Sequence, residues 1–398
     1  LAIIPHLDVV PAEEEGWESD PFEMTFRDGY IVGRGSSDDK GAAVISLYAL
    51  KFFAERGERY PYTMRLIFGT HEESGMADAD YYRRHYPQPL FGFTPDVGFP
   101  VGYAEKGSFS GDLTLPFPFK TIKKLEAGKN KYRVPDRALA LIAAKAADCP
   151  PEDNITITKE DQLLQIEARG KDGQVSWPAG TVNAVKVLTD YLLRHGLYAA
   201  EEEKALRVIR KYHDAIDGRQ LGIAFSDDIF GPLYTSGALL RSEDGRLIQS
   251  VTIRQPTGIE EERIRTALSA LAAEGDGEFQ TRTVRPPLVL DPERPEVRIL
   301  TDSYNEVFGT NEKPYAMGGG TYARKFDNVI SYGPGKRGQK EPEWIGGAHA
   351  ANEAFEAEQL FKALKVYIVA LARLQRHDFQ EPGAAGEADA EEISEQIN

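Results

Sequence analysis

The chain contains very little cysteine, with Cys149 the single one among 398 residues. One cysteine cannot form a disulfide within the chain, so we expect a reducing compartment and assign the protein to the cytoplasm. No run of about 18 apolar residues occurs, which argues against a membrane-spanning helix. Basic residues are outnumbered, 47 against 63 acidic ones, for a net charge of −16. We therefore expect no nucleic-acid partner, because phosphate binding needs a positive surface.

The acidic excess is concentrated at the end of the chain. Residues 378–398 contain seven acidic residues and no lysine or arginine, which predicts a disordered tail. The first residues, Leu-Ala-Ile-Ile, have the character of a buried strand and lack an initiating methionine, so we expect that a segment precedes them. With 41% hydrophobic and 28% charged residues, the composition is typical of a soluble globular protein.

Both ends of the globular part predict a parallel sheet covered by helices. A strand at Leu1–Val10, a helix at Gly41–Arg56 ended by Gly57, and a strand at Tyr62–Phe68 follow one another at the spacing of a parallel sheet. Further along, we predict a helix at Glu296–Phe308, a strand at Val329–Tyr332 and a helix at Glu353–Arg376.

The middle of the chain has a different pattern. We predict, in order, a helix at Pro135–Ala147, strand structure at Ile155–Arg169, helices at Asn183–His195 and Ala199–Tyr212, a hairpin at Leu239–Arg254, a helix at Ile259–Ala273 and a strand at Glu278–Val284. This pattern indicates an antiparallel sheet with helices on one face. The predicted fold is therefore α/β: a catalytic domain with a mostly parallel sheet (1–106 and 288–377), an inserted α+β lid domain (107–287) and the tail (378–398).

Acidic residues and histidines recur where predicted strands end. His6 and Asp8 lie toward the end of the first predicted strand and point to the same side of an extended chain, so Asp8 could orient His6 as a metal ligand. Asp38 lies in a Gly-rich loop before a helix, and the alternative there is a helix cap. Glu72 and Glu73 follow the next strand, where open α/β sheets place active sites. One of the pair could bind a metal while the other acts as a general base.

Two further positions complete the set. Asp96 lies in a Pro-Asp turn, and His349 lies near the predicted start of the last helix; each could instead be a turn or cap residue. Carboxylates and imidazoles without thiolates suit a catalytic pair of zinc ions better than a structural zinc.

Five motifs in order resemble the di-zinc metallopeptidase family of aminoacylases, succinyl-diaminopimelate desuccinylases and folate-cleaving carboxypeptidases, and most of all its PepV-type dipeptidases. They are His-Leu-Asp-Val-Val-Pro at 6–11, Gly-Arg-Gly-Ser-Ser-Asp-Asp-Lys-Gly at 33–41, Gly-Thr-His-Glu-Glu-Ser-Gly at 69–75 with Pro-Asp at 95–96, Gly-Gly-Gly-Thr-Tyr-Ala-Arg at 318–324, and His-Ala-Ala-Asn-Glu at 349–353.

The resemblance implies a role for each matching residue. It implies that His6 and Asp96 bind one zinc, that Glu73 and His349 bind the other, and that Asp38 bridges both, with a cis peptide bond to Asp39. It further implies that Glu72 is the general base on metal-bound water and that Asp8 steadies His6. Arg324 would bind a carboxylate of the substrate; its alternative is a surface salt bridge.

Two lid positions depart from the family. Where relatives carry an asparagine and a histidine that stabilise the oxyanion, this chain has Tyr132 and Gln174. A glutamine can donate a hydrogen bond but carries no charge, so we expect slow rather than absent turnover.

The resemblance thus implies zinc-dependent hydrolysis of the peptide bond in dipeptides or small peptides. Two zinc ions per chain are expected, with manganese or cobalt possible, in a monomer or homodimer. The alternatives are a deacylase acting on N-acyl amino acids and a weak or inactive metal-binding relative.

Overall fold

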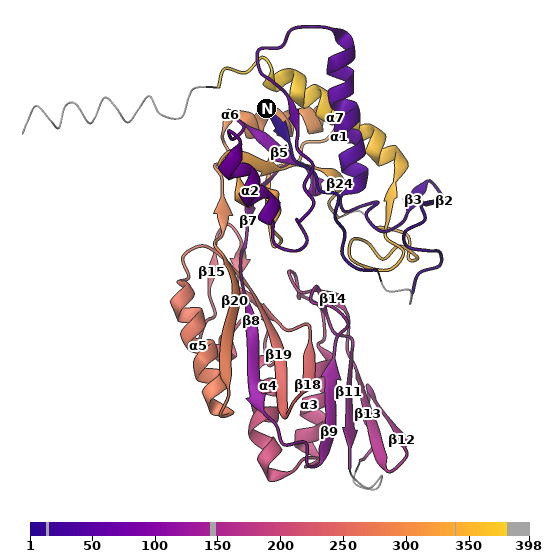
Figure 1. Cartoon of the computed structure of the whole chain (residues 1–398), viewed down its shortest axis with the longest axis vertical. Coiled ribbons are helices and arrows are strands. Elements are labelled where there is room, and N and C mark those ends of the chain that lie inside the picture. The colour runs from indigo at the N-terminus through magenta and orange to yellow at the C-terminus, as the bar shows by residue number, and fades with distance from the viewer. Residues whose placement is uncertain (13–15, 144–148, 339, 380–398) are drawn as a thin grey trace, which may run out of the picture. The chain divides into compact units, whose positions relative to one another are not determined.

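The computed structural model describes residues 1–12, 16–143, 149–338 and 340–379, and the chain forms two compact units (Figure 1). Unit 1 comprises Leu1–Tyr103, Asp291–Tyr315 and the chain from Thr321 onward. Unit 2 comprises Ala104–Leu290 and Ala316–Gly320. The predicted disordered tail lies outside the described residues, apart from its first two positions.

Unit 1 is built on a mostly parallel sheet. Strands β4, β1, β5 and β23 lie side by side and run parallel, while β7 is antiparallel beside β23. Their bounds are β1 Ala2–Ile3, β4 Arg65–Leu66, β5 Gly92–Thr94, β7 Gly102–Glu105 and β23 Val329–Ser331. The two predicted N-terminal strands are therefore present but shorter than expected. Because β1, β4 and β5 run the same way, the loops that follow them meet at one edge of the sheet.

Helices cover this sheet. They are α1 Lys40–Arg56, α2 Ala77–His85, α6 Pro295–Phe308 and α7 Ala357–Leu374. Helix α7 packs against α1 and α6, and the ring of its Tyr367 lies 5.0 Å from that of Phe93 on β5. Helix α1 ends as predicted, because Gly57 adopts the left-handed conformation (φ 65°) that a residue with a Cβ avoids.

Smaller ladders complete unit 1. Strands β2 (Thr25–Arg27), β3 (Tyr30–Val32) and β25 (Ala354–Glu356) form a three-stranded sheet, and β6 (Val97–Phe99) pairs with β24 (Pro334–Lys336). The prediction of a helix from Glu353 onward was wrong for its first turn. Those residues pair with β3 instead, and the helix begins at Ala357.

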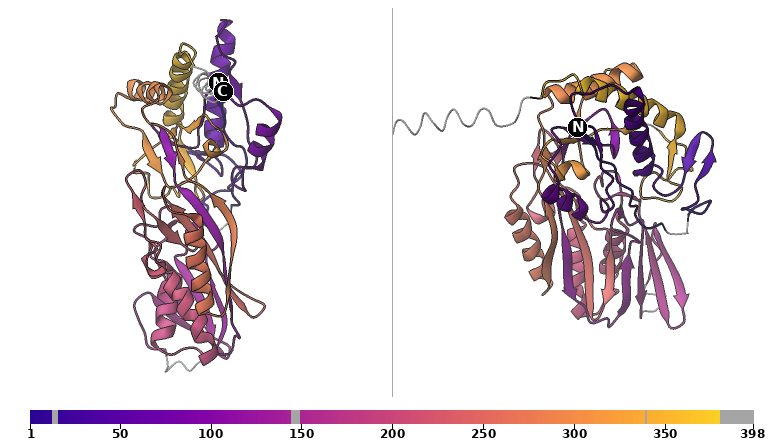
Figure 2. Two further views of the ribbon diagram at one scale, coloured as in Figure 1. Left: turned by 90° about the vertical axis from the view of Figure 1, so that its left-hand side faces the viewer. Right: turned by 45° about the horizontal axis from the view of Figure 1, so that its top comes forward.

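Unit 2 contains a large antiparallel sheet in the order β12-β13-β11-β9-β18-β19-β8-β20, with β17 beside β19. The bounds are β8 Gly107–Pro116, β9 Ile122–Ala127, β11 Arg137–Ile142, β12 Ile155–Glu160, β13 Leu163–Arg169, β17 Tyr234–Ser236, β18 Leu240–Glu243, β19 Arg246–Gln255 and β20 Glu278–Arg285. Its helices are α3 Ala184–Arg194, α4 Glu203–Tyr212 and α5 Glu261–Glu274. They lie on one side of the sheet (Figure 2, left).

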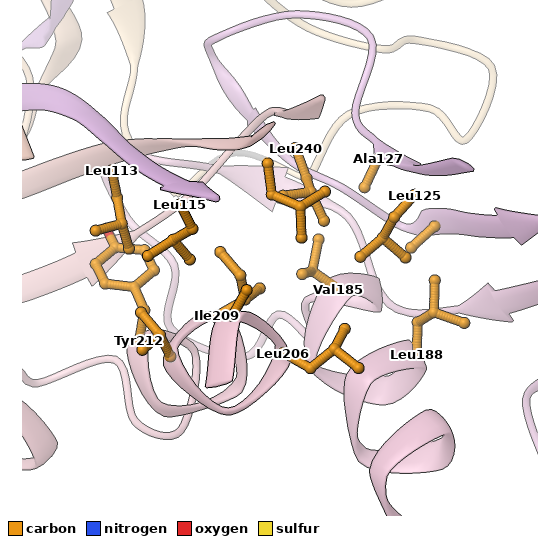
Figure 3. Packing of buried hydrophobic residues seen from close by; sticks show 14 of the residues in the cluster. Leu113, Leu115, Leu125, Ala127, Val185, Leu188, Leu206, Ile209, Tyr212 and Leu240 are labelled. Atoms are coloured by element: carbon orange, nitrogen blue, oxygen red, sulfur yellow. The ribbon is translucent and has the colours of Figure 1, made fainter. Parts of the chain in front are cut away.

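The core of unit 2 lies between these helices and the sheet. In Figure 3, leucines of β8 and β9 face apolar side chains of α3 and α4. The labelled residues include Leu113, Leu115, Leu125, Val185, Leu188, Leu206, Ile209 and Tyr212, all buried. Burying one such leucine contributes about 1.5–3 kcal/mol. The alternating burial along β8 explains why its sequence favours a strand.

The predicted helix at Pro135–Ala147 was wrong over its described part. Arg137–Ile142 forms β11, which pairs with β9 and β13. Its alanines and leucines favour a helix locally, but Ala138, Ala140 and Ile142 alternate as the buried face of a central strand. Pairing on both sides outweighs the helical preference. Residues 144–148 of this prediction lie outside the described residues.

Candidate metal centre

The site begins at His6, just beyond β1. Its side chain is fully buried, and residue 6 forms a parallel bridge with Gly69. The Nδ1 atom of His6 donates to the main-chain oxygen of Asp8 at 2.9 Å, which fixes the tautomer and leaves Nε2 facing the carboxylates. Nε2 lies 2.8 Å from Oδ1 of Asp38 and 3.8 Å from Oδ1 of Asp96.

Asp38 belongs to two groups of ligand atoms. One group is His6, Asp38 and Asp96; the other is Asp38, Glu73 and His349. Within each group the potential ligand atoms lie within 4.8 Å of one another. The second oxygen of Asp38, Oδ2, is 3.0 Å from Nε2 of His349, and that nitrogen is 2.8 Å from Oε1 of Glu73. The five residues therefore converge, with one aspartate common to both groups.

The loop that carries Asp38 is not a side-chain cap for α1. The N-cap residue is Asp39, and its side chain makes no capping hydrogen bond. Asp39 is buried, and its Oδ2 accepts instead from the main-chain N–H of His6 at 3.2 Å. The Asp38–Asp39 peptide bond is cis, as the resemblance implied. The structure therefore does not show a side-chain cap at this position. The loop is instead hydrogen-bonded to the main chain of His6, just beyond β1.

The loop after β4 is held by two aspartates. The carboxylate of Asp8 accepts from the main-chain N–H groups of Glu72 and Glu73, at 3.2 and 3.1 Å. Asp8 therefore orients both glutamates with its side chain and His6 with its main chain. Oδ2 of Asp78 accepts from Thr70 N (2.7 Å) and His71 N (3.1 Å), and also from the hydroxyl of Tyr322 (2.6 Å).

Glu72 differs from its neighbour. Its Oε1 atom is buried, and none of the described residues donates a hydrogen bond to it. Burial and the nearby carboxylates of Asp96, Glu73 and Asp38 raise the pKa of Glu72 well above its usual range, although His6 opposes them. A carboxylate with a raised pKa and an oxygen without a protein donor is suited to accepting a proton from a bound reactant.

The cluster is strongly coupled electrostatically. Burial disfavours the imidazolium, but hydrogen bonds to Asp38 and Glu73 outweigh it and raise the pKa of His349 to about 10. The pKa of His6 is also raised, by Asp38 and Asp96 against the effect of burial. Burial and Asp38 raise the pKa of Asp96 to about 7. Crowded carboxylates that need positive charge, together with imidazole nitrogens and no thiolate, fit a pair of divalent metal ions.

His349 does not lie where the sequence predicted. It occupies a turn with φ 63°, and β25 rather than a helix follows it. From this turn Nε2 of His349 reaches Oε1 of Glu73, at 2.8 Å, and the residues of β25 pair with β3. Arg324 lies in the short 3-10 helix η4 (Tyr322–Lys325) of the same unit.

Gln174 and Tyr132 belong to unit 2. Strands β10 (Arg133–Val134) and β14 (Gly173–Gln174) form a two-stranded ribbon in which Gln174 pairs with Arg133. The main-chain N–H of Val175 donates to the main-chain oxygen of Tyr132 at 2.9 Å. The structure therefore brings these two predicted lid residues together, and their role toward substrate stays a prediction.

Some residues of the site had no role in the sequence interpretation. Arg34, Asp78, Tyr322 and Glu353 lie around the loops that carry the ligands and are buried or half-buried. A charged residue that is buried looks the same in sequence as an exposed one, so its hydrogen bonds could not be predicted. The only signal available was that Arg34, Tyr322 and Glu353 lie inside matching motifs.

The chain is similar in sequence to one family of peptidases. The sequence model of "Peptidase family M20/M25/M40" matches residues 2–373. "Putative dipeptidase YtjP" of Bacillus subtilis is 28% identical over 398 residues, covering 94% of this chain and 83% of that protein. A putative dipeptidase of Staphylococcus epidermidis is likewise 28% identical, with 94% and 82% covered.

Solved structures share the fold. The di-peptidase Dug1p from Saccharomyces cerevisiae matches with a TM-score of 0.56 at 13% identity, over 94% of this chain and 80% of that one. The M20 family metallo-carboxypeptidase Sso-CP2 from Sulfolobus solfataricus matches with a TM-score of 0.57 at 16% identity, over 94% and 85%. These likenesses support the mixed α/β architecture. In the part of the chain that the structure describes, no helix is long and apolar enough to span a membrane.

Proposed function

The chain belongs to peptidase family M20/M25/M40 and is a metallopeptidase, and we propose that it hydrolyses the peptide bond of dipeptides and other small peptides with two zinc ions. The observation that carries this proposal is the pair of ligand groups that share Asp38, with the buried Glu72 oxygen beside them. The family match over residues 2–373 includes every residue of both groups.

In this proposal His6 and Asp96 would hold one metal ion, Glu73 and His349 would hold the other, and Asp38 would belong to both sets. When bound, such ions lower the pKa of water and polarise the scissile carbonyl. Glu72 would take a proton from the attacking water and return it to the leaving amine, a role suited to a carboxylate with a buried oxygen that none of the described residues donates to.

Asp8 would support this chemistry by positioning the two glutamates. Its carboxylate accepts hydrogen bonds from the main chain of Glu72 and Glu73, which would hold the base and its metal-binding neighbour in place. Arg324 would bind the free carboxylate of the substrate, for which a guanidinium fork is suited. Gln174 and Tyr132 would supply neutral donors during the reaction, and residues 107–287 would act as an inserted lid domain. A cytoplasmic monomer or homodimer remains part of the proposal.

The test is a metal and substrate panel. Protein stripped with a chelator should be inactive and should regain dipeptide hydrolysis on addition of about two equivalents of Zn²⁺, with Mn²⁺ and Co²⁺ as comparisons. Release of free amino acids from a set of dipeptides should exceed deacylation of N-acetyl amino acids. A preference for the acyl substrates would favour the deacylase. Tight metal binding without turnover of either set would favour an inactive relative.

A further inference from the structure

Glu353 is a buried carboxylate that the proposed chemistry does not use. It is fully buried, and it lies four residues after His349 and directly before β25. Burying an acidic group is costly unless it is paired and hydrogen-bonded. The hydrogen-bond partners of Glu353 should therefore indicate its role.

The partners of Glu353 are the loop that carries Asp38. Its Oε1 accepts from three main-chain N–H groups: Gly35 at 3.1 Å, Ser37 at 2.9 Å and Asp38 itself at 3.1 Å. Its main-chain oxygen accepts from Gly33 N at 3.0 Å. Hydrogen bonds from main-chain N–H groups to a carboxylate are strong and directional, so they fix the conformation of this loop.

The second carboxylate oxygen has a separate partner. Oε2 of Glu353 is 2.5 Å from Nη1 of Arg34, whose side chain is also buried. Arg34 lies over the ring of Trp17, with its Cζ 5.3 Å from the ring centroid. Arg34 therefore compensates the negative charge of the buried Glu353 carboxylate, while Glu353 holds the loop through its hydrogen bonds.

Resting on the proposed metal site, we propose that Glu353 is a positioning residue that sets the orientation of Asp38 and so supports both metal ions at once. The chain connects Glu353 to His349, and hydrogen bonds from three main-chain N–H groups to its carboxylate and from one to its main-chain oxygen connect it to the Asp38 loop. It therefore links a ligand of one group to the residue shared by both. Groups that orient metal ligands typically contribute 10–100-fold to metal affinity.

The test replaces Glu353 and measures metal binding rather than turnover. Glu353→Gln keeps the size but leaves one acceptor oxygen for partners that used two. We expect Zn²⁺ binding to chelator-stripped protein, measured by calorimetry, to weaken about 10–100-fold. We also expect the visible absorption spectrum of the Co²⁺-saturated variant to change, because misplacing Asp38 alters the ligand field.

Glu202 provides a matched control. It is also fully buried, and its carboxylate accepts from main-chain N–H groups of Thr121, Ile122 and Ala199 in unit 2. Glu202→Gln should lower the melting temperature but leave Zn²⁺ affinity and the Co²⁺ spectrum as in wild type. A purely structural role for Glu353 would give that same pattern.

The outcomes separate the two proposals. If Glu353→Gln lowers the melting temperature but binds metal like wild type with an unchanged Co²⁺ spectrum, the positioning role is overturned and the proposed function stands. Wild-type protein that binds no metal would overturn both. Should Glu353→Gln fail to fold, Glu353→Asp decides: it keeps the charge, is one methylene shorter, and should weaken metal binding in the same direction.

Discussion

Replacing Glu72 with glutamine should separate catalysis from stability. The substitution keeps the size of the side chain and removes its ability to accept a proton. Because Asp8 holds the main chain of this residue, the loop should keep its conformation. Glu73→Gln is the matched control, since it changes the adjacent residue in the same way but alters a proposed metal ligand.

The structure sets the expected magnitudes. Loss of a general base costs about 10²–10⁴-fold in kcat. The raised pKa of Glu72 means that its ionised form is unfavourable in the folded, metal-free protein. Stability from this group is thus full below the unfolded pKa of about 4.3 and is lost as pH rises through the higher folded pKa. Glutamine resembles the neutral form, so the metal-free variant should be more stable than metal-free wild type at pH 7.

Two assays test this reasoning. Dipeptide hydrolysis should fall at least 10²-fold in Glu72→Gln while Zn²⁺ content stays near wild type, whereas Glu73→Gln should lose metal. Urea unfolding in the presence of a chelator should show the stabilisation at pH 7, and it should shrink as the pH is lowered toward 4. A metal-free Glu72→Gln protein that is less stable than wild type, or a variant that retains full activity, would refute the assignment of Glu72 as the buried base.

Three other predictions concern separate parts of the chain. A Cβ on Gly69 would clash with the hydroxyl and ring of Tyr322, so Gly69→Ala should destabilise the protein by about 1–3 kcal/mol in urea unfolding; an unchanged midpoint would mean that Tyr322 is not fixed there. Burial lowers the pKa of His213 to about 4 despite its hydrogen bond with Gln249. The contribution of this residue to the free energy of unfolding should therefore be full above pH 6.5 and fall by about 1–2 kcal/mol at pH 5. His213→Asn should flatten that pH dependence if the histidine causes it. Finally, Gln174→His should raise kcat more than it changes KM, because a donor that can be cationic acts mainly in the transition state; an unchanged kcat would show that the alignment of Gln174 with the family histidine is wrong.

Much of unit 1 could be predicted from local sequence. The helices at Lys40–Arg56 and Pro295–Phe308 follow from their apolar composition and from glycine at the position after each. The ligand residues could be proposed because histidine and carboxylates recur directly after buried strands, and such strand ends meet at one edge of a parallel sheet. These features depend on neighbours in the chain, which the sequence shows directly.

Other features depend on partners that are distant in the chain. Arg137–Ile142 has helical residues, yet it is a strand because β9 and β13 pair with it on both sides. His349 lies in a turn because the residues that follow it pair with β3, more than 300 positions earlier. In each case non-local hydrogen bonds outweigh the local preference.

The sequence by itself determined which residues were candidates for metal binding, and that a candidate base, Glu72, is adjacent to a candidate ligand, Glu73. Only the tertiary structure decided that Asp38 faces both histidines, that Asp8 holds the two glutamates through their main chain, and that Glu353 accepts hydrogen bonds from the loop of Asp38. The physical reason is that the role of a buried carboxylate depends on which groups donate hydrogen bonds to it. Its hydrogen bonds go to main-chain N–H groups, which every residue except proline carries, so residue identity does not reveal them.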